Sequence, residues 1–152
     1  MKQKLKLLIC ISILLFLCIK NLHAQQIIVP NKEFFKEVKT LLDKGYAVKF
    51  QAKGKSMMPI ISDSDCVTIQ KSNTISLYDI VLAEVNPEQY ILHRVIEISD
   101  EDITLMGDGN TYGTEKCRPE DIIARAISLH VNDEEYQLGS SLEKNWAMVW
   151  NE

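Results

Sequence analysis

The chain has 152 residues, of which 46% are hydrophobic, and its 17 Lys and Arg against 21 Asp and Glu give a formal net charge of −4. This length favours one domain with a modest core. An acidic balance without a basic patch repels phosphate backbones, which argues against a nucleic-acid partner.

The first 24 residues have the layout of a secretory signal peptide. Residues 7–19 are apolar apart from Ser12, follow three lysines, and are too short to span a bilayer comfortably, which takes about 20 residues. Ala24 suits the position before a cleavage site, so we expect a mature N-terminus at Gln25. A retained membrane anchor is the alternative. We expect export to the periplasm or the outer face of the inner membrane.

Residues 25–152 are then expected to form a single domain. The four lysines of the leader leave with it, so 13 Lys and Arg face 21 Asp and Glu, a formal charge of −8. The domain begins with a predicted amphipathic helix at residues 32–44. Asn31 is a suitable N-cap, Gly45 follows the last turn, and apolar residues recur at helical spacing between them. The apolar stripe predicts packing on the domain, with a membrane surface or a partner as the alternative.

From residue 46 onward short apolar and alternating runs are separated by turn residues, a pattern typical of β-strands. We expect strands at residues 47–52, 66–70, 79–85, 90–98, 103–106, 122–130 and 135–137, and residues 141–150 are a candidate for a short closing helix. The predicted fold class is therefore mainly β, with an N-terminal amphipathic helix.

Cys66 and Cys117 remain once the leader is removed. In an oxidising compartment they could pair, but the favoured interpretation is two half-buried small hydrophobic side chains. The chain has no CxxC or HExxH pattern and no cluster of histidines. We therefore expect neither a metal site nor a cofactor.

Three polar residues follow one another in an order that hydrolytic enzymes use. Ser56 lies in Gly-Lys-Ser-Met-Met-Pro, His93 in Leu-His-Arg-Val and Asp108 in Gly-Asp-Gly-Asn. A serine hydroxyl becomes a good nucleophile when a neutral histidine takes its proton and an acceptor fixes the tautomer of that histidine. Ser56 is therefore the candidate nucleophile, His93 the base and Asp108 the orienting acid.

The predicted hairpin of residues 90–98 and 103–106 places the base opposite the acid. A turn centred between residues 100 and 101 pairs positions that are equally distant from it. The predicted pairs include Ile98 with Ile103, Ile96 with Leu105, and His93 with Asp108. Directly opposed residues have Cβ atoms about 4.5–5.5 Å apart, close enough for an imidazole to donate to a carboxylate.

Each of these residues also has an ordinary interpretation. Ser56 could be a polar loop residue, His93 a half-buried strand residue, and Asp108 a turn former. Lys53 and Lys55 are alternative bases. A lysine must be desolvated to be neutral near pH 7, so solvated loop charges are the favoured interpretation of both.

Several motifs between Lys49 and about His130 resemble the superfamily of type I signal peptidases and self-cleaving SOS-repressor peptidases. The matching blocks are Ser56-Met57-Met58-Pro59, Asp65-Cys66-Val67, Asp79-Ile80-Val81, His93-Arg94-Val95 and Gly107-Asp108-Gly109-Asn110. The resemblance implies the β-rich peptidase fold of that superfamily, with Ser56 as nucleophile. It also implies small residues near the scissile bond of the substrate.

The residue before Arg94 distinguishes two mechanisms within the superfamily. Bacterial signal peptidases and SOS repressors have lysine there, whereas the endoplasmic-reticulum and archaeal type has histidine, as this chain does. The resemblance therefore implies the Ser/His variant, with Asp108 supporting the histidine. A further acid of that type has no clean counterpart, because Thr114 occupies its position and Glu115 is only a nearby substitute.

The oxyanion site departs from the signal-peptidase pattern. Gly54 stands where signal peptidases have a serine whose hydroxyl helps to bind the oxyanion, and so resembles the repressor pattern. Oxyanion support would then come from backbone N–H groups around Gly54 and Ser56, with Ser56 as the first donor. Met57 and Met58 are candidates for the substrate groove, with core packing as the alternative.

The sequence thus predicts a small exported or membrane-associated serine endopeptidase that cleaves peptide or protein substrates without a cofactor. A catalytically silent peptide-binding module with the same fold is the first alternative. A self-cleaving regulator is the second, and it is disfavoured because a leader replaces the expected DNA-binding domain.

Overall fold

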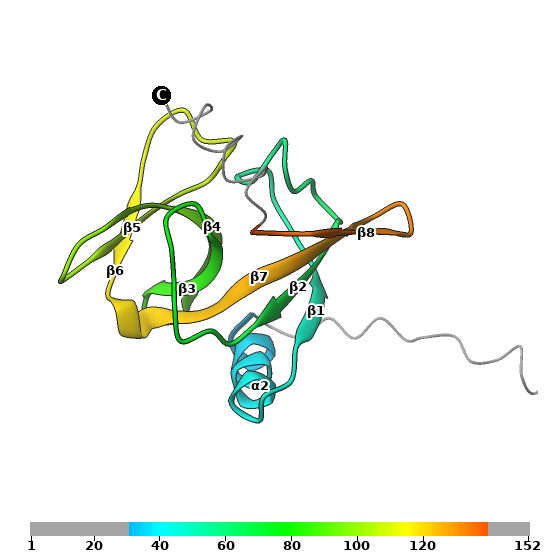
Figure 1. Ribbon diagram of the computed structural model, residues 1–152, viewed down its shortest axis with the longest axis horizontal. Helices are drawn as coiled ribbons and strands as arrows, with labels where there is room; N and C mark the ends of the chain where they lie inside the picture. Colours follow the sequence, from blue (N-terminus) through cyan, green and yellow to red (C-terminus); the bar gives the residue numbers. More distant parts are fainter. Residues whose placement is uncertain (1–30, 140–152) are drawn as a thin grey trace, which may run out of the picture.

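The computed structural model of the chain describes residues 31–139. The leader and the candidate closing helix at residues 141–150 lie outside them. The predicted mainly β class is confirmed, because one helix packs on one curled antiparallel sheet (Figure 1). The elements are α2 (Asn31–Asp43), β1 (Val48–Gln51), β2 (Cys66–Gln70), β3 (Ile80–Asn86), β4 (Gln89–Ile98), β5 (Ile103–Met106), β6 (Glu115–Cys117), the 3₁₀ turn η1 (Pro119–Asp121), β7 (Ile122–Val131) and β8 (Glu134–Gln137).

Strand β7 joins the two halves of the sheet. The strand order is β1-β2-β7-β3-β4-β5-β6, and β8 pairs with β7 beside this path. In Figure 1, β7 runs diagonally between β1 and β2 on one side and the curl of β3 to β6 on the other. The sheet therefore encloses two hydrophobic clusters.

The first cluster lies between α2, β1, β2, β3 and β7, and the second lies within the curl of β3 to β6. Buried members of the first include Val38 and Leu42 of α2 with Val67, Ile69 and Leu82. The second consists of Val81, Ala83, Val95, Ile103, Leu105 and Cys117.

Helix α2 packs on the domain, as its apolar stripe predicts. Its last turn is closed by two hydrogen bonds, from the Gly45 N–H to the Leu42 carbonyl (2.9 Å) and from the Tyr46 N–H to the Leu41 carbonyl (3.1 Å). Gly45 has a φ of +85°, a conformation that glycine adopts without strain. Within residues 31–139, no helix is long and apolar enough to cross a membrane.

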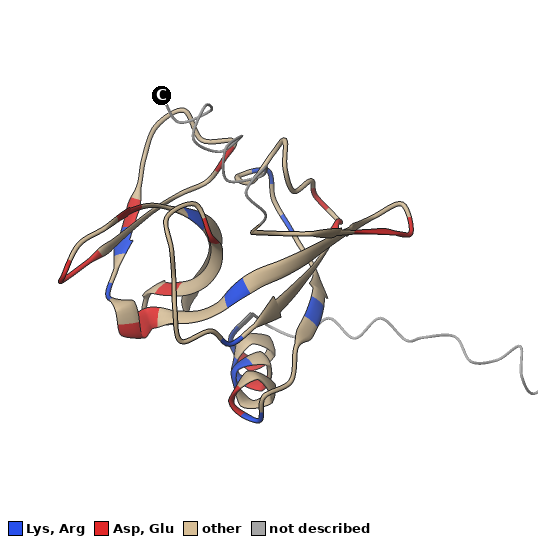
Figure 2. Ribbon diagram, viewed as in Figure 1, with Lys and Arg blue, Asp and Glu red and all other residues tan. Residues whose placement is uncertain are grey.

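Charged residues occur on most elements of the described part of the chain. Figure 2 shows acidic residues on the β4–β5 turn, on the β7–β8 turn and around η1, while basic residues are spread over α2 and several strands. The exposed β4–β5 and β7–β8 turns are therefore acidic.

The two cysteines are not paired with each other. Both are free thiols; Cys117 is buried in the second cluster, whereas Cys66 is half-buried on β2. Burial raises the pKa of the Cys117 thiol to about 11. This placement confirms the interpretation of both as small hydrophobic side chains.

The register of the β4–β5 hairpin agrees with the prediction near the turn and departs from it further away. Ile98 faces Ile103 and Glu97 faces Thr104, as predicted, but an irregularity at Ile96 shifts the pairing by one residue, so that Val95 faces Leu105. The predicted pairs of Ile96 with Leu105 and His93 with Asp108 are therefore wrong. One extra residue in a strand moves every residue beyond it to the other face. Arg94, rather than His93, consequently turns towards Asp108.

Candidate active site

His93 is buried on β4 and has a carboxylate partner that comes from β6. Its side chain is 7% exposed, and its Nδ1 lies 3.0 Å from Oε2 of Glu115, whose side chain is 33% exposed. A carboxylate can only accept hydrogen bonds, so Nδ1 carries a proton, and in the neutral ring Nε2 then has the lone pair. This is the tautomer that a general base acting through Nε2 needs.

Strand register explains why these two side chains meet. Val95 pairs with Leu105, and Leu105 pairs with Glu115 on its other side. Directly paired residues share a face of the sheet, and His93 shares the face of Val95 because it is two residues away. Glu115 and His93 therefore point to the same side of the curled sheet.

Asp108 holds Arg94 instead of His93. The Arg94 guanidinium donates from Nε to Oδ1 and from Nη2 to Oδ2 of Asp108, both at 2.7 Å, and from Nη1 to the Tyr78 carbonyl at 2.8 Å. The side chains of Arg94 and Asp108 are 1% and 6% exposed. The prediction that Asp108 orients His93 is wrong, because the shift at Ile96 pairs Arg94 with Met106 and so puts Arg94, not His93, on the face that Met106 and Asp108 share.

The Arg94–Asp108 ion pair fixes a loop that lies against the candidate nucleophile. Residues 107–110 follow β5, and the Gly109 N–H donates to the Ser56 carbonyl at 2.8 Å. A Cβ atom on Gly107 would lie 2.3 Å from the Ser56 carbonyl oxygen and 3.0 Å from His93 Nε2. Ser56 and His93 therefore approach the same point from two sides, and only glycine leaves room there.

We expect Gly107→Ala to lower activity more than stability. The added methyl must displace either the Ser56 carbonyl or the His93 ring, and a displacement of about 1 Å at reacting groups lowers rates by roughly 10²-fold. Peptide-cleavage rates and urea denaturation of the purified variant measure the two effects. Gly113→Ala serves as the control, because a Cβ at Gly113 meets nothing within 4 Å, although its φ of +88° carries its own strain. Unchanged kcat/KM in Gly107→Ala would contradict this account of the site.

Ser56 and His93 both line a cavity of about 540 Å³. Within residues 31–139, no hydrogen bond joins the Ser56 hydroxyl to His93. Such bonds are often long in peptidases without substrate and tighten when substrate binds. The structure thus brings Ser56, His93 and Glu115 together. Asp108 binds Arg94 and fixes the loop next to Ser56.

The loop before Ser56 is shaped by Gly54. This residue has a φ of +101°, and its N–H donates to Oδ1 of Asp63 at 2.8 Å. The Gly54 N–H is therefore engaged and does not bind an oxyanion, contrary to the backbone support predicted for it. The Ser56 N–H makes no hydrogen bond with another described residue, so it stays the candidate donor.

Met57 and Met58, the two candidates for the substrate groove, differ in burial and in their position relative to the cavity. Met57 is 5% exposed, belongs to the first cluster and lines the cavity, whereas Met58 is 40% exposed and does not line it. Lys53 and Lys55 are both exposed, in keeping with solvated loop charges.

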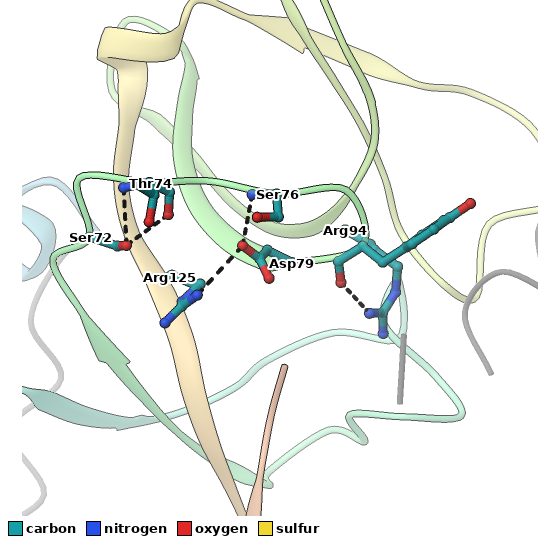
Figure 3. Close-up of polar contacts among 7 residues, drawn as sticks. Ser72, Thr74, Ser76, Asp79, Arg94 and Arg125 are labelled. Carbon is teal, nitrogen blue, oxygen red and sulfur yellow. Dashed lines mark hydrogen bonds and ion pairs between the residues drawn. The ribbon is translucent and has the colours of Figure 1, made fainter. Parts of the chain in front are cut away.

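Asp79, from another of the matching motif blocks, is buried and makes polar contacts with neighbouring residues (Figure 3). Its Oδ2 accepts the Ser76 N–H at 2.9 Å and lies 3.7 Å from Nη1 of Arg125. Its carbonyl accepts the Val95 N–H at 2.9 Å. Asp79 therefore fixes the segment before β3 next to Arg94.

Comparison with known proteins agrees with the resemblance found in the sequence. A sequence model of a family described as Peptidase S24-like matches residues 19–127. This range contains Ser56, His93, Asp108 and Glu115, and it confirms the predicted superfamily of signal peptidases and SOS-repressor peptidases. No curated protein matches the chain significantly.

Proposed function

The chain belongs to the Peptidase S24-like family, and from this premise we propose that it is a serine endopeptidase of the Ser/His type. Ser56 is the nucleophile, His93 the general base and Glu115 the acid that orients His93. The observation that carries the proposal is the 3.0 Å contact between His93 Nδ1 and the Glu115 carboxylate, beside the close approach of Ser56 and His93 Nε2 to Gly107.

Each step of peptide hydrolysis has a group to perform it. His93 Nε2 takes the Ser56 proton while Oγ attacks the substrate carbonyl, and the Ser56 N–H stabilises the oxyanion that forms. The imidazolium then gives its proton to the leaving amine as the peptide bond breaks. Water, deprotonated by His93, hydrolyses the acyl-enzyme and releases Ser56. Glu115 holds the ring and stabilises the imidazolium in both halves of the reaction.

We further propose that the substrates are exported peptides or proteins, handled at the periplasmic side of a membrane. The leader-like first 24 residues support this location, and the histidine before Arg94 supports the endoplasmic-reticulum and archaeal type of mechanism. Membrane contact of the enzyme is part of this proposal.

A peptide library incubated with the wild-type chain and with Ser56→Ala tests the function. We expect mass spectrometry to show internal cleavage by the wild type and none by Ser56→Ala. Ser62→Ala is the matched control, because Ser62 lies in the same loop and its hydrogen bonds within the described residues use only its backbone: its N–H donates to Oδ2 of Asp65 and its carbonyl accepts the Asp65 N–H.

The other outcomes identify the alternatives. Peptide binding without cleavage in the wild type would indicate a silent binding module. Cleavage of the chain itself, at a rate independent of its concentration, would indicate a self-cleaving regulator. A rise in rate only in the alkaline range, unchanged in His93→Gln, would indicate a lysine base.

A further inference from the structure

The cavity that Ser56 and His93 line is also lined by residues of helix α2. Its other lining residues include Met57, Leu92 and Ala52. Four rings of the lining form an aromatic wall, which consists of Phe34, Phe35, Phe50 and Tyr90. A single cavity therefore connects the candidate nucleophile to a group of large apolar side chains.

The rings of the aromatic wall contact one another. Ring centroids of Phe35 and Tyr90 are 4.6 Å apart, those of Phe34 and Phe35 are 5.0 Å apart, and those of Phe34 and Phe50 are 6.0 Å apart. All four side chains are only half-buried. They pack against the first cluster and also line the cavity, and apolar surface of this kind gains free energy when a ligand covers it.

Helix α2 supplies half of the aromatic wall. Val38 and Leu42 anchor the helix in the first cluster with 2% and 1% exposure, while Phe34 and Phe35, one turn earlier, reach the cavity. The remaining rings come from β1 and β4. Part of the cavity lining thus comes from α2, which precedes all the matching motif blocks in the sequence.

The spacing along β4 relates the wall to the scissile bond. Tyr90 precedes His93 by three residues, which corresponds to about 10 Å in an extended strand, and both line the cavity although this odd spacing puts them on opposite faces of β4. An extended substrate rises at the same rate and alternates its side chains, so a residue two or three positions from the scissile bond reaches the wall. The small residues implied by the family resemblance belong at the scissile bond itself, close to Ser56.

We propose that the aromatic wall binds a bulky apolar side chain, aromatic or long aliphatic, of the peptide substrate, two or three residues from the scissile bond. Phe34 and Phe35 are then specificity-determining residues. This inference rests on the proposed function, because it identifies the cavity as the substrate site of the same peptidase.

Matched peptides that differ only at that position test the proposal. We expect the wild type to cleave peptides with Phe or Leu there with a kcat/KM about 10-fold or more above that of the Ala peptide. Phe34→Ala and Phe35→Ala should reduce this ratio to about 2-fold or less, mainly through slower cleavage of the Phe and Leu peptides. Leu41→Ala, on the same helix but outside the cavity, should keep the wild-type ratio.

A cavity-filling variant tests the same proposal in case the alanine variants do not fold. Ala52→Leu fills the cavity from the residue after β1 and should reverse the preference, so that the Ala peptide becomes the better substrate. A wild type with no preference at any position two or three residues from the cleaved bond would overturn the proposal.

Binding to Ser56→Ala separates this inference from the proposed function. Fluorescence anisotropy of labelled peptides should show about 10-fold tighter binding of the Phe peptide than of the Ala peptide. Selective binding without cleavage by the wild type would support the aromatic wall and overturn the peptidase. Cleavage by the wild type with equal binding of both peptides would support the peptidase and overturn the wall.

Discussion

Replacing His93 with alanine is expected to lower kcat/KM for peptide cleavage by about 10⁴–10⁶-fold, the range found when the base of a serine peptidase is removed. The physical reason is that the Ser56 hydroxyl is a poor nucleophile without a base at Nε2. The Ser56→Ala/His93→Ala double variant should be no slower than either single variant, because both residues act in one unit. Steady-state kinetics with a cleaved library peptide measures all three enzymes.

Glu115→Gln is expected to be slower than the wild type by about 10²–10⁴-fold. The amide has the size of the carboxylate, but it does not stabilise the imidazolium, and its NH₂ group can hold the wrong tautomer of His93. Glu120→Gln is the control, since Glu120 is exposed in η1 and pairs only with Arg118 at 3.7 Å. A Glu115→Gln enzyme with wild-type kcat would show that the His93–Glu115 contact has no part in catalysis.

The orienting acid could not be identified from the sequence, for two local reasons. The shift at Ile96 adds a residue to one strand of the hairpin, and an Ile among other apolar residues gives no signal for such an irregularity. Glu115 begins β6, a strand of three residues, Glu-Lys-Cys, without the apolar alternation that predicts strands. The motif Gly107-Asp108-Gly109-Asn110 therefore favours Asp108 as the orienting acid, and Glu115 stands in the sequence only as a nearby substitute for a further acid.

Most of the fold was predictable because its strands alternate or are continuously apolar. Strands β2 and β5 have the predicted bounds. The bounds of the other predicted strands within the described residues differ from the prediction by one residue at one end or at both ends. Helix α2 followed from apolar spacing and from Gly45 at its end. Packing between distant elements was not predictable. Nothing in the spacing of Phe34 and Phe35 indicates that they meet Phe50 and Tyr90 at the cavity.

Because Asp108 is buried and pairs with Arg94, the ion pair is expected to contribute to the stability of the fold. Arg94→Met should lower the free energy of unfolding by about 3–5 kcal/mol, because it leaves the buried Asp108 carboxylate without its bidentate partner. The Arg94→Met/Asp108→Leu double variant should recover much of this loss, since an apolar pair of similar volume removes the uncompensated charge. Urea denaturation followed by circular dichroism measures each variant. Lys71→Met is the control and should change little, because Lys71 and Asp43 form an exposed pair.

The same variants reveal what the ion pair does for the active site. The Arg94–Asp108 ion pair holds the loop whose Gly109 N–H binds the Ser56 carbonyl, so the double variant should stay less active even where its stability recovers. A double variant with both wild-type stability and wild-type kcat/KM would show that the ion pair does not position Ser56. A single Arg94→Met variant as stable as the wild type would show that Asp108 is not held as a buried charge.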